Sequence, residues 1–116
     1  MTLYKLKKTD EFSSVFSFRK RFYGEWLFAN IKPNQLSHHR YGLVVSKKVS
    51  KLAVRRNYMK RVLREVLRAH PAIAPVCFDV VVQVRKPFKQ GEFAQVRQDV
   101  ETLLRRLSKS VHVHAS

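Results

Sequence analysis

The chain has 116 residues, of which 24 are lysine or arginine and 8 are aspartate or glutamate, so its formal net charge is +16 at pH 7. This length is typical of one domain, and a hydrophobic content of 45% argues against a disordered basic tail. No apolar run approaches the ~20 residues that span a bilayer, so we expect no membrane segment and no signal peptide. A single cysteine, Cys77, excludes an intramolecular disulfide and is typical of a cytoplasmic protein. The excess of positive charge predicts a polyanionic partner.

The first part of the chain predicts a basic arm, a short helix and two strands. Residues 1–8 are expected to form a flexible arm. Thr9 is the expected N-cap of a helix, because two acids follow it and apolar residues then recur at helical spacing. That helix is expected to end within residues 19–24. Strands are predicted at residues 26–32 and 41–46, and the polar loop between them favours antiparallel pairing.

The rest of the chain predicts a helix, a strand and a second helix. Apolar residues at helical spacing indicate a helix over residues 52–70 and another from Phe93 to Leu107. The valine run in residues 78–85 indicates a strand at the centre of a sheet, and residues 108–116 are expected to fray. The order predicts one α+β domain over residues 1–116: a mostly antiparallel sheet of about four strands packed against three helices, with a β-α-β unit.

Positive charge is concentrated in residues 46–68, which contain nine bases and one acid, Glu65. Lys60, Arg64 and Arg68 repeat every four residues, a spacing at which like charges repel on a helix. A solvated helix face is the alternative, but the absence of acidic partners favours a phosphate backbone as the ligand. The predicted RNA-binding residues are Lys47, Lys48, Lys51, Arg55, Arg56, Asn57, Lys60, Arg61, Arg64 and Arg68.

Protein-based catalysis is not expected from this sequence. The eight acids are scattered, and the only adjacent pair, Asp10 and Glu11, fits the start of a helix better than a metal site. The pair His38 and His39 lies in a predicted loop, and only three glycines are present, so no phosphate-cradling glycine loop is expected. We therefore predict no catalytic and no metal-binding side chain in the protein.

One stretch resembles the signature of a known family. It runs Ser46-Lys47-Lys48, then Ala53-Val54-Arg55-Arg56-Asn57-Tyr58-Met59-Lys60-Arg61-Val62-Leu63-Arg64-Glu65. This stretch closely resembles the signature of the bacterial ribonuclease P protein subunit, in which a strand ends in Ser-Lys-Lys and a basic helix follows. Weaker similarities occur in Leu6-Lys7-Lys8, Arg40-Tyr41-Gly42-Leu43 and Phe78-Asp79-Val80-Val81-Val82. The resemblance covers about residues 4–107.

The resemblance implies a function in which RNA is the catalyst. The catalytic RNA removes the 5′ leader of precursor tRNA with Mg²⁺, and the protein binds both RNAs. It also implies a left-handed β-α-β crossover, and a cleft that holds the single-stranded leader through stacking on aromatic rings. The residues implied to line this cleft are Phe12, Phe16 and Phe28. Core packing is the alternative role for the first two. No membrane and no obligate protein partner are expected.

Two positions depart from the family pattern, and other functions compete with the one it implies. Tyr58 stands where the family often has an arginine, and Ala29 falls at a strand position that is aromatic in some members. A ribosomal-type or other structural RNA-binding protein is the main alternative, since it shares size, charge and fold class. An autonomous nuclease is disfavoured by the scattered acids, and a membrane-surface helix by the need of its apolar face for a core.

Overall fold

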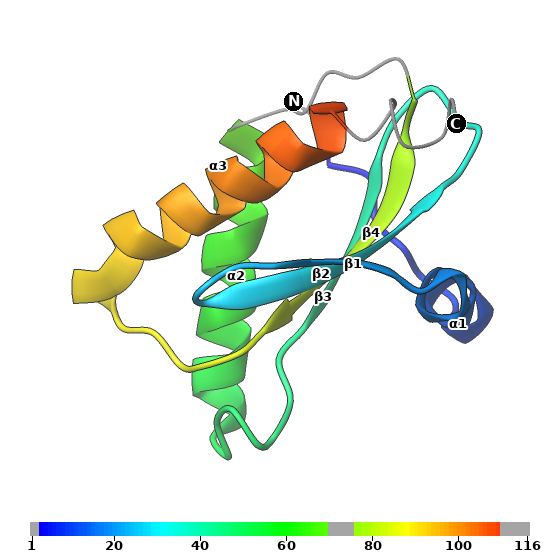
Figure 1. Ribbon diagram of the computed structural model, residues 1–116. Helices are drawn as coiled ribbons and strands as arrows, with labels where there is room; N and C mark the ends of the chain where they lie inside the picture. The colour runs from blue at the N-terminus through cyan, green and yellow to red at the C-terminus, as the bar shows by residue number, and fades with distance from the viewer. Residues whose placement is uncertain (1–2, 70–75, 110–116) are drawn as a thin grey trace.

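The computed structural model describes residues 3–69 and 76–109, in which one mixed sheet lies between α1 on one face and two longer helices on the other (Figure 1). The elements in chain order are α1 (Thr9–Phe18), β1 (Lys20–Tyr23), β2 (Leu27–Pro33), β3 (Arg40–Val44), α2 (Ala53–Ala69), β4 (Phe78–Val84), the 3-10 turn η1 (Gln90–Glu92) and α3 (Phe93–Lys109). The α+β class and the three predicted helices are therefore confirmed.

The strand order in the sheet is β1-β2-β4-β3. β2 pairs antiparallel with β1 and β4, whereas β3 pairs parallel with β4. The predicted antiparallel pairing of residues 26–32 with 41–46 is wrong, because β4 lies between these strands. Burial explains the order: β4 is buried along nearly its whole length, as the valine run predicted, and so occupies the centre. β3, α2 and β4 form the expected β-α-β unit.

β1 is a strand where the sequence indicated only the end of a helix. Arg19 has a φ of 61°, in the left-handed region, so α1 stops at Phe18 and the chain turns directly into the sheet. Lys20 then pairs with Ile31, and Tyr23 pairs with Phe28. With this short strand the sheet has four strands, the number that was predicted.

The sheet separates two apolar clusters. The larger cluster lies under α2 and α3 and contains Leu27, Ala29 and Ile31 of β2. The smaller one lies under α1, where Leu6, Val15 and Val81 pack with the half-buried Phe12. Because neighbouring residues of a strand face opposite sides, Phe28, Asn30 and Lys32 of β2 face α1. Lys32 donates through Nζ to the Ser14 hydroxyl of that helix.

The N-terminal segment differs from the expected flexible arm. Lys5 forms a parallel bridge with Tyr41, and Leu6 is only 6% exposed. Thr9 is the first residue of α1, not its cap. Glu11 satisfies the helix start instead, since its Oε1 accepts the backbone N–H groups of Lys7 and Lys8 at 2.8 and 2.9 Å. These contacts lower the pKa of Glu11 below its ordinary value.

At its C-terminal end the described chain is helical through Lys109, so the predicted fraying does not hold for residues 108 and 109, and the rest of that segment, residues 110–116, lies outside the described residues. Among the described residues, none of the helices combines the length and apolarity needed to cross a bilayer.

Candidate nucleic-acid interface

The basic stripe, which we define as Asn57, Lys60, Arg61, Arg64 and Arg68, runs along one face of α2. The opposite face is buried in the larger cluster through Met59, Val62, Leu63, Val66 and Leu67. Apolar residues thus fix the rotation of the helix, and the stripe must face away from the core. Asn57, Arg61 and Arg68 are exposed, while Lys60 and Arg64 are half-buried.

The bases of this stripe keep their charge free for a ligand. Ion pairs in the described part of the chain include those of Arg40 with Glu11 and Asp79 and that of Lys86 with Glu25. None of them uses a base of the stripe. Four cations therefore stay close together without a counter-ion from those residues, an arrangement that phosphate groups stabilise with release of bound counterions. The resulting surface suits the backbone of a nucleic acid.

The loop before α2 is held in place by Arg56. Its Nη1 donates to the carbonyl oxygens of Ser50 and Lys51, each at 2.9 Å. The same loop begins with a turn in which Val49 N–H donates to Ser46 O at 3.1 Å. Arg56 is thus half-buried and orders a loop whose three lysines are exposed. These are Lys47, Lys48 and Lys51. Arg55, also predicted as an RNA contact, is exposed in the first turn of α2.

An aromatic cluster, defined as Tyr23, Phe28, Arg21 and Arg85, lies on the sheet face that carries α1. The rings of Tyr23 and Phe28 stack with centroids 5.8 Å apart. The Arg21 guanidinium lies 5.5 Å from the Phe28 ring and 5.9 Å from the Tyr23 ring, and that of Arg85 lies 5.9 Å from the Tyr23 ring. Tyr23 is 57% exposed. The cluster therefore offers π-faces and cations to solvent at once, as surfaces that stack single-stranded bases do.

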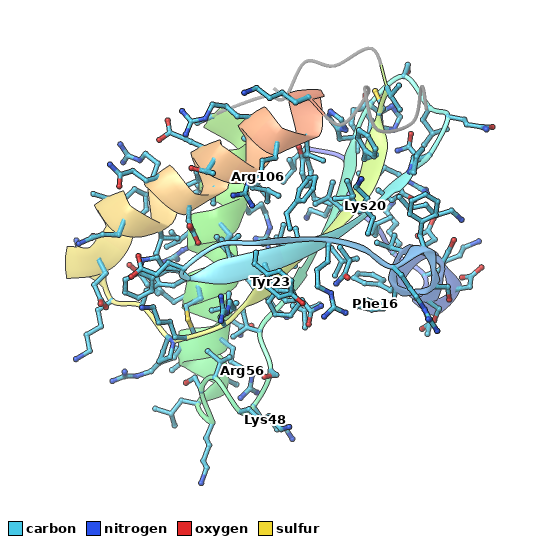
Figure 2. The ribbon with its side chains drawn as sticks, in the orientation of Figure 1. Phe16, Lys20, Tyr23, Lys48, Arg56 and Arg106 are labelled. Carbon is cyan, nitrogen blue, oxygen red and sulfur yellow. The ribbon has the colours of Figure 1, made fainter. Side chains whose placement is uncertain are left out.

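The three phenylalanines predicted to line a cleft have different positions. Phe28 belongs to the aromatic cluster, and Phe16 is 39% exposed on α1. Figure 2 shows Phe16 and Tyr23 on the same side of the sheet, with Lys48 and Arg56 at the start of α2. Phe12 instead packs toward β3, where its ring fills the space above Gly42. The structure thus places Phe12 apart from the Phe28 ring.

Sequence reasoning missed Arg21, Tyr23 and Arg85. The signal that could have identified the first two is the alternation of side-chain direction in residues 20–23. If this segment is a strand, Arg21 and Tyr23 point to the same face. Arg21 is further fixed by its Nε, which donates to Asn30 Oδ1 at 2.9 Å. Arg85 follows β4 and donates to the Gly24 carbonyl at 2.7 Å. Both cations are therefore positioned by the sheet rather than left to solvent.

Carboxylates in the described residues serve structural contacts. Asp99 accepts backbone N–H groups of residues 25–27 at 2.8 to 3.2 Å, and Glu92 accepts that of Lys89 at 3.0 Å. Asp79 and Glu11 both bind Arg40. In the described chain, no three of the histidines, cysteines and acids gather into a group that could hold a metal ion.

Comparisons with known proteins point to one family. The family model for ribonuclease P matches residues 2–108. The ribonuclease P protein component of Aromatoleum aromaticum is 45% identical over 104 residues, covering 89% of this chain and 86% of that protein. The one of Chromobacterium violaceum is 41% identical over 106 residues, covering 91% and 87%.

Solved structures show the same fold. The ribonuclease P protein of Thermotoga maritima superimposes with a TM-score of 0.78 at 32% identity, covering 88% of this chain and 96% of that one. The Staphylococcus aureus protein gives 0.76 at 27% identity, covering 91% and 96%. These matches disfavour the ribosomal-type alternative. The chain belongs to the ribonuclease P protein family and serves in maturation of the tRNA 5′ end.

Proposed function

We propose that this chain binds two RNAs through two parts of one surface. The basic stripe and the lysines of residues 47–51 hold the catalytic RNA of ribonuclease P. The aromatic cluster, with Phe16 opposite it on α1, holds the single-stranded 5′ leader of precursor tRNA. The observation that carries the proposal is the cluster itself: the exposed Tyr23 ring stacks on the half-buried Phe28 ring beside two arginines, an arrangement that suits unpaired nucleotides.

In the proposed function, the RNA catalyses the hydrolysis and the protein does not. Three described carboxylates, those of Glu11, Asp79 and Asp99, already bind Arg40 or backbone N–H groups, and no three histidines, cysteines or acids of the described residues gather into a group that could hold a metal ion. The described residues therefore do not fit a Mg²⁺ site of their own. We propose that Mg²⁺ is held by RNA phosphates, and that the protein contributes by neutralising charge and by holding the leader next to the site of cleavage.

A reconstitution assay tests the leader site. The full chain is combined with a bacterial ribonuclease P RNA, and affinities are measured for precursor tRNA and for mature tRNA. We expect Tyr23→Ala to weaken precursor binding by about 5- to 100-fold, the range given by loss of stacking on one base. Mature tRNA has no leader, so its binding should not change.

The matched control is Leu36→Ala, which removes a side chain that is 43% exposed in the loop between β2 and β3. This variant should bind both tRNAs as the unmodified protein does. Equal loss of precursor and mature tRNA with Tyr23→Ala, or no loss with either, would show that the aromatic cluster does not hold the leader.

A further inference from the structure

A recess lies at the outer edge of β3. This edge pocket has a volume of about 180 Å³ and lies between the N-terminal segment, β3 and α2. Leu3 and Leu6 contribute apolar walls from the N-terminal segment, and the Phe12 ring contributes one from α1. The pocket is thus large enough for one flat ring, and the Phe12 ring forms part of its wall.

The main chain of β3 supplies polar groups at this pocket. Tyr41 donates its N–H to Tyr4 O at 2.9 Å and accepts from Leu6 N–H at 3.0 Å, so its polar groups point to the outer edge. Because the direction alternates along a strand, the N–H and C=O of Leu43 point to the same edge. Leu43 lines the pocket, and none of the main-chain hydrogen bonds found in the described residues covers that edge of it.

Three cations surround the opening. Lys5 comes from the N-terminal segment, and Lys60 and Arg64 come from the basic stripe. Lys60 and Arg64, which line the pocket, are half-buried, whereas Arg61 and Arg68 are exposed. An apolar recess with a main-chain donor and acceptor inside, and positive charge at its mouth, matches a planar base joined to a phosphate.

We propose that the edge pocket takes one unstacked ribonucleotide. The base enters against Leu6 and Phe12 and bonds to the N–H and C=O of Leu43, while its phosphate meets Lys60 and Arg64. This inference rests on the proposed function, because the pocket opens onto the stripe that holds the catalytic RNA. It adds a base-reading contact to a surface that otherwise contacts only phosphates.

The first test is an NMR titration of the unmodified full chain with adenosine monophosphate, compared with inorganic phosphate. Phosphate should shift side-chain signals of basic residues, Lys60 and Arg64 among them, and leave the backbone amide of Leu43 unchanged. Adenosine monophosphate should shift these and also the backbone amide of Leu43. If the nucleotide shifts only the signals that phosphate shifts, the pocket does not take a base and the proposal is overturned.

The second test fills the pocket without changing charge. Leu3→Trp should weaken binding of the catalytic RNA by about tenfold, the value of one stacked base, and leave the dependence of binding on salt unchanged. Leu36→Trp, on an exposed loop residue, is the matched control and should bind normally. Circular dichroism verifies that both variants fold; if Leu3→Trp does not, the titration still decides.

Separate measurements identify the source of the nucleotide. If Leu3→Trp loses affinity only for the catalytic RNA, the nucleotide belongs to that RNA. If the variant loses affinity only for precursor tRNA in the assembled enzyme, the nucleotide belongs to the leader. Normal binding by folded Leu3→Trp in both measurements refutes the pocket. The proposed function survives that result if Arg61→Ala still weakens RNA binding, so the two failures are distinguishable.

Discussion

Arg40 and Asp79 form a two-pronged ion pair across the parallel strands β3 and β4, with Nε and Nη2 of the arginine 2.8 and 2.7 Å from the two carboxylate oxygens. The remaining Nη1 donates to Glu11 Oε2 at 2.8 Å and so ties α1 to the same point. The Asp79 side chain is only 9% exposed. Arg40 therefore joins the helix that carries Phe16 to the sheet that carries the aromatic cluster.

The first prediction concerns stability. Arg40→Ala leaves the Asp79 carboxylate largely buried with only Asn34 Nδ2 bonded to it, so we expect a loss of about 2–3 kcal/mol in the free energy of unfolding, measured by urea denaturation. Glu25→Ala is the control: Glu25 and Lys86 are 3.6 Å apart and well exposed, so the loss should stay below about 0.5 kcal/mol. Equal losses would contradict the central role of Arg40.

A second prediction uses the contact of Phe12 with Gly42. A Cβ on Gly42 would lie 2.3 Å from Phe12 Cε1, so Gly42→Ala must push the ring and α1 away from the sheet. We expect a loss of about 1–3 kcal/mol in stability from this overpacking. Adding Phe12→Leu should recover part of it, because the smaller side chain makes room for the methyl group. A double variant less stable than the sum of both single changes would argue against this packing.

The sequence predicted the elements well and their pairing less well. The valine run of residues 78–85 identified the central strand, and the apolar spacing of α2 identified its buried face. The parallel pair of β3 and β4 belongs to the predicted β-α-β unit, but the pairing of β2 with β4 was missed, because pairing depends on burial over the whole sheet rather than on loop length. Tyr23 was missed because β1 begins after a turn at Arg19 with a left-handed φ, a conformation that an arginine in the sequence does not predict.

The basic stripe was predictable for the same reason that α2 was. Its residues follow the period of a helix whose other face is apolar, so their common direction is set by the sequence alone. The role of Arg56 was not predictable: a guanidinium can bind phosphate or backbone carbonyls, and only the path of residues 50–51 shows that it meets two carbonyl oxygens. The position of Phe12 likewise depends on Gly42, which is distant in sequence.

A third prediction follows from the lowered pKa of Glu11. Backbone N–H groups of Lys8 and Lys7 lower the pKa most, and the Arg40 charge lowers it further from the ordinary value of 4.5. A carboxylate with a lowered pKa in the folded state stabilises the fold above its unfolded pKa, and this contribution is lost as pH falls through the folded pKa. Stability should therefore fall with acidification below about pH 4.5.

Glu11→Gln tests this dependence. The amide cannot carry the charge, so the variant should be less stable than the unmodified protein at pH 7, and the difference should shrink toward pH 3 in urea denaturation. Asp10→Asn is the control, because Asp10 lies in the same helical turn but is exposed. A difference for Glu11→Gln that stays constant from pH 7 to pH 3 would contradict the assignment.

The last prediction distinguishes Arg61 from Arg56, both of which were predicted from the sequence to bind RNA. Arg61 is exposed on the basic stripe, so Arg61→Ala should weaken binding of the catalytic RNA and lower the slope of log K against log salt by about one, as expected for one lost phosphate contact.

Arg56 bonds to Ser50 O and Lys51 O, so Arg56→Ala should release the loop that presents Lys47, Lys48 and Lys51. Hydrogen exchange should then become faster in residues 47–52 with Arg56→Ala and stay unchanged with Arg61→Ala. The guanidinium of Arg56 is the group that links these two carbonyl oxygens to α2. Faster exchange in both variants, or in neither variant, would therefore show that Arg56 does not order the loop.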